Sequence, residues 1–349
     1  MKIVVLNDQL NPGGAEKVLV YMTNLLHKNN IDVSVILFLK EGILDNQILK
    51  GINIHYLNRT SRFDFKAWKK LKALTKDADI VHVHSRYNLR FYMLVKFILG
   101  IAKPKVVFHE HIPSFKIDSF TTFLYKRVDA YVAVQDAMRK WAVENGFVKN
   151  DKAFYLPNTV YPPKQTIAYQ NKIGKLIMVA NFRPPKNHFF AIELIKNLPE
   201  NYTLDFYGMI DDKNYFDEVV NTINTHNLNN RIKIIQGVTD LYSVMSNYSL
   251  AIHTANAETG PLVLIEYLYA ALPFVSYNTG DVVEVVKLTL PELVLHEFDI
   301  NFWVKHILLI EQKNRDENFL AKMKSLANTH FSEQAYFDKL QSIYHKVVQ

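Results

Sequence analysis

Glu258 and Glu266 stand on either side of a predicted strand-to-helix turn, with seven residues between them. Gly260 and Pro261 occupy the turn, and proline suits the first position of a helix because its missing N–H would have no partner there. A helix start presents unpaired backbone N–H groups and a positive dipole end, which together bind phosphate. Glu266 can accept hydrogen bonds from a ribose diol and Glu258 from a sugar. This segment therefore predicts a site that holds a nucleotide-sugar at three points.

A proline-stiffened loop, NFRPPKNHF, follows another predicted strand and carries two cations, Arg183 and Lys186. Beside the ligand-binding edge of a sheet, Arg as a fork and Lys as a point charge suit a diphosphate. A solvated basic turn is the alternative for this motif alone. The diphosphate interpretation is favoured because the segment from Glu258 to Glu266 belongs to the same predicted domain.

Two loops in the first half of the chain also carry candidate residues. Gly13 and Gly14 precede a predicted helix, and paired glycines let the backbone approach a ligand closely. A plain strand-to-helix turn without a ligand is the alternative interpretation. The sequence HEH places His109 and His111 on one face of an extended chain, and Glu110 on the other. No HExxH motif or cysteine set accompanies them, so zinc is not indicated. Contact with a substrate hydroxyl and a structural role both remain open for these histidines.

The elements that must position these residues alternate between apolar β-branched runs and longer amphipathic segments, the pattern of parallel sheets covered by helices. There is no GxGxxG or Walker motif, which argues against the commonest dinucleotide and ATP sites. In open parallel sheets ligands bind at the carboxyl ends of the strands, so we expect a site in a cleft between two domains. Strands are predicted at residues 2–6, 32–38, 52–56, 80–84, 105–109, 130–134 and 153–156, then at 175–180, 203–207, 232–236, 250–253 and 274–276. Residues 157–174, with paired prolines and no apolar periodicity, are the predicted interdomain linker.

The composition is that of a globular protein, with 349 residues of which 49% are hydrophobic. The absence of cysteine excludes disulfides and thiolate metal sites, and fits a reducing compartment. No apolar run approaches the length of a membrane span, and the start of the chain reads as a buried strand and not as a signal sequence. We therefore expect a cytoplasmic protein.

The net charge of +7 is concentrated in the first half of the chain. Residues 1–165 contain 25 Lys and Arg against 14 Asp and Glu, whereas acidic residues are in excess in the remainder. Much of the basic character lies in the aromatic and lysine-rich segment from Arg62 to Lys76. Such a segment can lie on an anionic membrane surface, or it can be an ordinary surface helix with its apolar face on the core. No recognition motif supports nucleic-acid binding.

Taken together, these motifs resemble the retaining glycosyltransferases of family 4, also called glycosyl transferases group 1, over essentially the whole chain. The most specific parts are ETGPLVLIE and ALPFVSYNTGDVVEVV, which are similar to that family's EGxPxxLxE and GxPVVxxxxGGxxEV. The GGAE motif, the histidine after a mid-domain strand, the NFRPPKNH loop and the closing helix support the resemblance. It implies the GT-B fold, in which two doubly wound Rossmann-like α/β domains face a central cleft. We expect an acceptor-side domain at 1–165, completed by the helix 332–349, and a donor-binding domain at 166–331.

Carried over by position, the resemblance implies a donor site and a catalytic group. Glu266 would bind the ribose and Glu258 the sugar, while Arg183 and Lys186 would neutralise the leaving diphosphate in place of a metal. His111 matches the family histidine near the reacting sugar. Backbone contacts to the donor would come from Gly13, Gly14, Gly260, Pro261, Leu262 and Val263.

Three departures from the family pattern stand out. Ala180 and Asn181 occupy the family's Gly-Arg positions, so Arg183 is a displaced substitute. Asp281 replaces the second glycine of the GG pair, and Ala271 stands where glycine is common. These changes bear on sugar preference and leave the diphosphate site as predicted.

The resulting expectation is a retaining, metal-independent glycosyltransferase that requires no cofactor. Its donor would be a nucleotide-sugar of the UDP type, and its acceptor a hydroxyl of a membrane-associated or cell-surface glycan, such as lipopolysaccharide, capsule, teichoic acid or a lipid-linked oligosaccharide. Peripheral association with the inner face of the cytoplasmic membrane would follow. Two alternatives remain: a nucleotide-sugar epimerase of the same fold, and a non-catalytic glycan- or nucleotide-binding partner.

Overall fold

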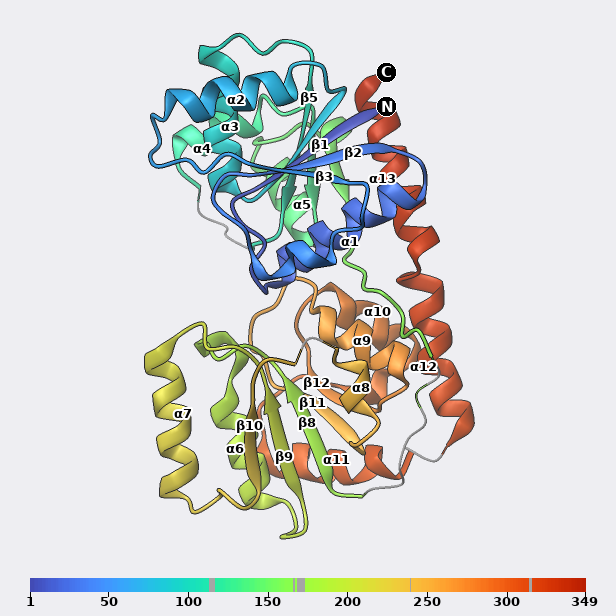
Figure 1. Cartoon of the computed structure of the whole chain (residues 1–349). Coiled ribbons are helices and arrows are strands. Elements are labelled where there is room, and N and C mark those ends of the chain that lie inside the picture. The colour runs from blue at the N-terminus through green and yellow to red at the C-terminus, as the bar shows by residue number, and fades with distance from the viewer. Residues whose placement is uncertain (113–116, 166, 168–172, 239, 314–315) are drawn as a thin grey trace. The chain divides into compact units, whose positions relative to one another are not determined.

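A computed structural model describes residues 1–112, 117–165, 167, 173–238, 240–313 and 316–349 (Figure 1). The chain divides into two compact units. Unit 1 comprises Met1–Val160 and Glu333–Gln349, and unit 2 comprises Tyr161–Ser332. The predicted linker at 157–174 includes the boundary between them, but its residues 166 and 168–172 lie outside the described residues.

The sheet of unit 1 has seven parallel strands in the order β3-β2-β1-β4-β5-β6-β7. Runs such as KIVVLN and IVHVH are buried almost throughout, because helices cover both faces of the sheet. The order reverses between β1 and β4, which defines the topological switch point of this unit. The strands are β1 (Lys2–Asn7), β2 (Asp32–Leu37), β3 (Asn53–Tyr56), β4 (Ile80–His84), β5 (Lys105–Glu110), β6 (Ala130–Ala133) and β7 (Ala153–Tyr155).

Two apolar cores enclose this sheet. One core lies between the sheet and the helices α2 (Phe65–Thr75), α3 (Arg86–Ile98), α4 (Ser119–Tyr125) and α5 (Asp136–Glu144). The other core contains α1 (Gly14–Lys28), the 3-10 turn η1 (Ile43–Gln47) and the C-terminal helix α13 (Glu333–Val348). A second 3-10 turn, η2 (Asn150–Lys152), precedes β7. The last helix of the chain is thus part of the core of unit 1.

Unit 2 repeats the same winding with six parallel strands in the order β10-β9-β8-β11-β12-β13. Its switch point lies between β8 and β11. The strands are β8 (Lys175–Val179), β9 (Thr203–Tyr207), β10 (Ile232–Ile235), β11 (Leu250–His253), β12 (Phe274–Tyr277) and β13 (Val294–Leu295). The helices are α6 (His188–Asn197), α7 (Lys213–Thr225), α8 (Tyr242–Met245), α9 (Leu262–Ala270), α10 (Asp281–Thr289), α11 (Ile300–Gln312) and α12 (Glu317–His330), with the 3-10 turns η3 (Pro184–Lys186) and η4 (Pro291–Leu293).

The predicted fold class is confirmed. All twelve predicted strands are present with ends within one residue of the prediction, and among the described residues only the two-residue strand β13 is new. Its two residues are too few to show a period, so the sequence carries no strand signal there.

The basic segment at residues 62–76 forms α2 with the loop before it. Trp68 and Leu71 are fully buried in the core, which is the arrangement of an ordinary surface helix, while Phe63 and Phe65 remain exposed. Within the described residues, no helix is both long and apolar enough to cross a membrane.

Candidate functional site

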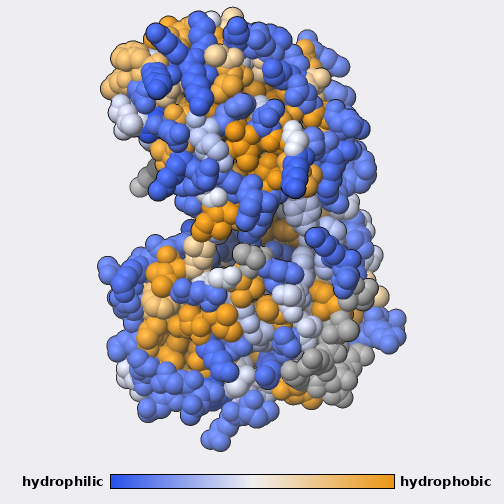
Figure 2. Space-filling view, in the orientation of Figure 1, coloured by the Kyte–Doolittle hydropathy of each residue, from blue (hydrophilic) through white to orange (hydrophobic). Residues whose placement is uncertain are grey.

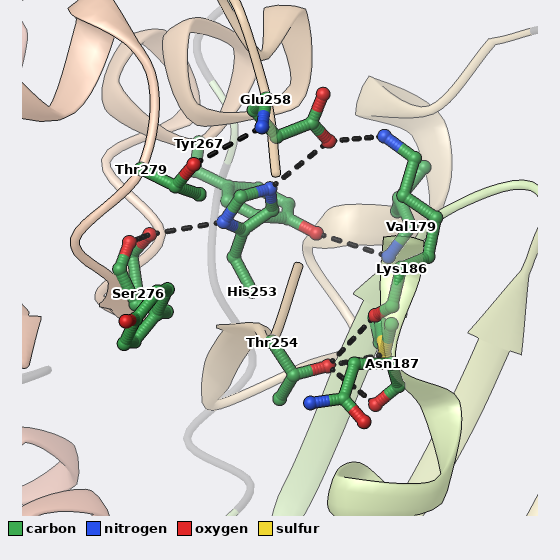
Figure 3. A network of polar contacts seen from close by, with 11 residues as sticks. Val179, Lys186, Asn187, His253, Thr254, Glu258, Tyr267, Ser276 and Thr279 are labelled. Carbon is green, nitrogen blue, oxygen red and sulfur yellow. Dashed lines mark hydrogen bonds and ion pairs between the residues drawn. The ribbon is translucent and has the colours of Figure 1, made fainter. Parts of the chain in front are cut away.

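The candidate donor residues of unit 2 come from the two loops that meet at its switch point. The loop after β8 leads through η3 to Lys186, and the loop after the neighbouring β11 leads to Glu258. Because loops at the carboxyl ends of adjacent parallel strands lie side by side, residues 72 apart in sequence come into contact. Figure 3 shows the resulting network of polar contacts.

Lys186 and Glu258 form an ion pair through the ammonium Nζ and the carboxylate Oε1. Both side chains are largely buried, with 14% and 12% of their surface exposed. Burial alone would raise the pKa of Glu258, but His253 and the Lys186 ammonium outweigh it and lower that pKa to about 2. The carboxylate is therefore charged throughout the physiological pH range. Two of the predicted catalytic residues are thus joined directly.

His253 is the third member of this cluster. Its Nε2 lies 3.5 Å from Oε1 of Glu258, a distance that is long for a hydrogen bond and that we treat as an electrostatic contact. Its Nδ1 lies 3.0 Å from the hydroxyl of Ser276 on β12, which fixes the plane of the ring (Figure 3). His253 was not among the predicted site residues, although its place at the end of a predicted strand was a signal for it.

The hydroxyl of Thr254 lies 3.1 Å from the backbone carbonyls of both Lys186 and Asn187 (Figure 3). This contact ties η3 to the end of β11. Asn187 adopts the left-handed conformation with φ of 55°, which turns the chain into α6. The backbone of Lys186 is therefore held against the end of β11 by these hydrogen bonds.

The Glu258 loop is held from the other side by the start of α10. The backbone N–H of Glu258 donates to the Thr279 hydroxyl at 3.0 Å, and the N–H of Asp281 donates to the Thr259 carbonyl at 2.7 Å. Gly280 has φ of +83°, and a Cβ there would lie 2.8 Å from Cδ of Pro261. Glycine is required at 280 both for conformation and for space. Asp281, the departure from the family pattern, contributes its backbone to this contact.

Arg183 contacts a different part of unit 2, the loop after β9. Its Nε is 3.9 Å from the carboxylate of Asp211, and about half of its side chain is exposed. Asn181 contacts the same carboxylate through its amide at 3.2 Å. The two predicted cations thus have different surroundings, with Lys186 buried against Glu258 and Arg183 on the surface.

The predicted phosphate-binding turn leads into α9. The helix begins at Leu262, with Pro261 at its N-cap in an extended conformation and Gly260 buried before it. Val263 is buried, and Glu266 is half-buried on the second turn. At the other end of the helix Ala271 adopts the left-handed conformation with φ of 51°, a position that favours glycine. The carboxylates of Glu258 and Glu266 therefore flank the start of one helix.

In unit 1 the sequence-predicted histidines belong to a larger cluster. His82 and His84 alternate on β4, and His84 is paired in register with His109 on β5. His111 follows β5, and its ring centroid lies 4.2 Å from that of His109. As the alternation predicts, Glu110 points to the other face of the sheet, where it forms a buried ion pair with Arg86 at 2.6 Å. His82 and His84 were not among the predicted site residues, although the VHVH run in the sequence was a signal for them.

Hydrogen bonds connect these imidazoles in pairs. His84 Nδ1 lies 2.8 Å from His111 Nε2, and His82 Nε2 lies 3.2 Å from His109 Nδ1. Burial lowers the pKa of His82 and His111 to about 3 and that of His84 and His109 well below the ordinary value. His111 is therefore uncharged at neutral pH. It can exchange a hydrogen bond with a substrate hydroxyl, but it does not supply a positive charge.

Three of these histidines, His82, His84 and His109, have ring nitrogens within 4.8 Å of one another. Imidazole nitrogens of this kind bind zinc and related ions. All three ligands would be imidazoles, as in some zinc sites, and the Nε2 atoms of His84 and His109 have no hydrogen-bond partner within the described part of the chain. The hydrogen bonds that are present describe a cluster of neutral rings.

Gly13 and Gly14 follow β1 at the switch point of unit 1 and begin α1. Neither has a positive φ, and no atom lies within 4 Å of the position that a Cβ of Gly14 would take. Space within the chain therefore does not require glycine at 14. Its missing side chain leaves the backbone at the helix start accessible, as a close approach to a ligand would require.

Two doubly wound parallel sheets, each reversing at a switch point, are the architecture of the GT-B fold, and a cation–carboxylate pair lies at the switch point of the second sheet. The model of Glycosyltransferase Family 4 matches residues 12–162, and that of Glycosyl transferases group 1 matches residues 164–328. The two matches together cover most of the chain, which belongs to this family of glycosyltransferases.

Solved structures share the fold over the whole chain. HepE (Alr3699) of Anabaena, in complex with UDP, is 17% identical with a TM-score of 0.80, covering 98% of this chain and 99% of that one. A glycosyltransferase of Rickettsia africae is 15% identical with a TM-score of 0.78, covering 100% and 99%. A TarM variant of S. aureus, in complex with fondaparinux, alpha-GlcNAc-glycerol and UDP, is 10% identical with a TM-score of 0.80, covering 99% and 100%. No curated protein matches the sequence.

Proposed function

We propose that this glycosyltransferase moves a sugar from a UDP-linked donor to a hydroxyl of a membrane-associated or cell-surface glycan, with retention of anomeric configuration. The observation that carries the proposal is the buried Lys186–Glu258 pair at the switch point of unit 2. A diphosphate needs a cation there, and a sugar needs an acceptor for its hydroxyls. Structures of HepE in complex with UDP and with UDP-glucose support a donor of this class.

In the proposed donor complex, Glu266 accepts hydrogen bonds from the ribose and Glu258 from the sugar. The backbone of residues 260–263, at the start of α9, binds phosphate through its N–H groups and the helix dipole. Lys186 moves its charge from Glu258 to the diphosphate, and Arg183 adds a second charge from the surface. His111, with Gly13 and Gly14, contributes from unit 1 as a neutral hydrogen-bonding group.

No carboxylate of the described residues is assigned as a covalent nucleophile, so we favour departure and attack on the same face of the sugar. The bond from the anomeric carbon to the phosphate oxygen breaks, and the bond to the acceptor oxygen forms. The proton of the acceptor hydroxyl passes to the leaving phosphate oxygen. Lys186 and the start of α9 stabilise the negative charge where it develops.

The proposed reaction is independent of metal, because Lys186 and Arg183 supply the charge that a divalent ion would otherwise bring. Transfer by the purified protein should be unchanged by EDTA. A loss of activity with EDTA that Mg²⁺ or Mn²⁺ restores would contradict this part of the proposal.

A nucleotide-sugar screen by thermal stabilisation, followed by transfer assays with the best donor, tests the proposal. Lys186→Ala should lower turnover about 100- to 1000-fold because it removes the charge that meets the leaving group. Glu266→Gln should weaken UDP binding about tenfold, the effect of losing a charged hydrogen bond. Lys196→Ala and Glu200→Gln, which change exposed residues of the same unit outside the predicted motifs, are the matched controls.

Full transfer activity in both Lys186→Ala and Glu266→Gln would refute the site assignment. Conversion of the donor without any acceptor would indicate an epimerase. Nucleotide binding without turnover toward any glycan acceptor would indicate a non-catalytic partner protein.

A further inference from the structure

The basic character of unit 1 is confined to one stretch of its chain. Residues 59–127 contain 15 Lys and Arg against 5 Asp and Glu, whereas the rest of unit 1 contains 11 against 11. This stretch includes α2, α3 and α4, which cover one face of the sheet. The charge excess found in the sequence therefore coincides with the part of the chain that contains these three helices.

The same side exposes a cluster of large apolar side chains. Phe97, Ile98, Phe120 and Phe123, at the end of α3 and on α4, are 49%, 56%, 47% and 41% exposed. We call these four residues the α3–α4 patch. The ring centroids of Phe97 and Phe123 lie 6.3 Å apart, and those of Phe120 and Phe123 lie 6.4 Å apart. Such a cluster is not part of the core, and exposed apolar clusters of this kind mark interaction surfaces.

Cationic side chains adjoin the patch. The guanidinium of Arg127 lies 3.5 Å above the ring of Phe123, and Lys126 is exposed beside it. The Lys72 side chain of α2 donates to the Leu99 carbonyl at 2.7 Å, which places the end of α2 against the end of α3. In Figure 2, blue and orange side chains alternate over the region of α2 to α4. Aromatic and apolar side chains surrounded by Lys and Arg match the interface of an anionic bilayer.

We propose that unit 1 docks on an anionic membrane through the α3–α4 patch, with the surrounding cations on the lipid headgroups. This inference rests on the proposed function in one respect: docking on the membrane would bring the protein to a membrane-associated acceptor. It differs from the expectation for residues 62–76, because Trp68 and Leu71 of that segment are buried in the core and cannot enter a bilayer.

Sedimentation of the full chain with vesicles tests the proposal, using phosphatidylcholine alone or an equal mixture with phosphatidylglycerol. We expect binding only to the anionic vesicles, weakened by salt. Phe97→Ser with Phe123→Ser should reduce binding at least about tenfold, since both rings leave the interface. Phe302→Ser with Leu309→Ser, at similarly exposed positions of unit 2, should leave it unchanged. Thermal unfolding of each variant confirms that it is folded.

Two outcomes would overturn the proposal: no binding of the wild type to anionic vesicles, or equal binding by the wild type and the Phe97/Phe123 variant. Phe63→Ser with Phe65→Ser distinguishes the patch from α2, and greater loss in that variant would move the contact there. UDP-induced thermal stabilisation is measured on the same samples. Vesicle binding without a donor response would refute the proposed function alone, and a donor response without vesicle binding would refute the membrane contact alone.

Discussion

At the scale of single residues, Lys186 and Glu258 each hold the other in place. Both are largely buried, so separating them without a replacement would leave a charge with little solvent. A diphosphate and a sugar provide such replacements, because the phosphate can pair with the Lys186 ammonium and the sugar hydroxyls can donate hydrogen bonds to the Glu258 carboxylate. Exchange of partners, and not creation of a new charged site, is the step that we expect on donor binding.

A double-mutant cycle measures the interaction energy between Lys186 and Glu258. Lys186→Met and Glu258→Gln should each destabilise the protein at pH 7, where the low pKa of Glu258 keeps the carboxylate charged. The double variant should lose less than the sum, with a coupling energy of about 1–2 kcal/mol, because the second change removes the partner that the first left unpaired. Urea unfolding gives the free energies. Additive effects would mean that the two charges do not stabilise each other.

Gly280 is the residue whose backbone most restricts the Glu258 loop. Its φ of +83° and ψ of 157° lie in a region that essentially only glycine adopts. Gly280→Ala should destabilise the protein by about 2–3 kcal/mol and reduce donor binding, because the new Cβ would push on Pro261 and Thr259. Gly100→Ala is a control, with φ of +62° and no atom within 4 Å of the new Cβ. An equal loss in both variants, measured by urea unfolding, would show that crowding at Pro261 has no effect.

At the scale of elements, the sequence was sufficient to predict the strands and the two loops of the donor site. Buried parallel strands read as short apolar runs, and the loops that follow them carry the functional residues. The partners across the sheet could not be predicted in this way. That Glu258 meets Lys186, and that His109 meets His84, depends on which strands are neighbours. Local periodicity in the sequence does not reveal this strand order.

The C-terminal helix shows the same limit. The family resemblance predicted that this helix completes the first domain, but it did not predict that the Tyr344 hydroxyl lies 2.7 Å from Nδ1 of His82, which is 262 residues away. The contact joins α13 to β4 at the center of the sheet of unit 1. It also connects the helix to the histidine cluster, because His82 in turn contacts His109.

Tyr344→Phe should therefore destabilise the protein by about 1–2 kcal/mol, since it leaves a buried imidazole nitrogen without its partner. Tyr336 lies on the same helix, is also buried, and has a hydroxyl without a hydrogen-bond partner in the described regions. Tyr336→Phe should accordingly be neutral or slightly stabilising. Urea unfolding of the two variants compares them directly, and a larger loss for Tyr336→Phe would contradict the hydrogen bond to His82.

At the scale of the whole molecule, the two units differ in their buried histidines. Unit 1 contains His82, His84, His109 and His111, all with pKa values lowered by burial. Unit 2 buries His188 and His253, and burial lowers the pKa of His188 to about 3. The four imidazoles of unit 1 lie beside its switch point, so acid acts there on both stability and the candidate site.

Acidification should therefore unfold unit 1 before unit 2. A histidine with a folded pKa below its ordinary value of 6.5 binds protons more readily in the unfolded chain, so stability falls as the pH drops from 6.5 toward 3. At pH 5 the loss is about 2 kcal/mol for each of His82 and His111. Hydrogen exchange at pH 7 and pH 5, corrected for intrinsic rates, should show β1, β4 and β5 losing more protection than β8, β9 and β11. Equal loss in both sheets, or earlier loss in unit 2, would refute the assignment of acid sensitivity to the histidine cluster.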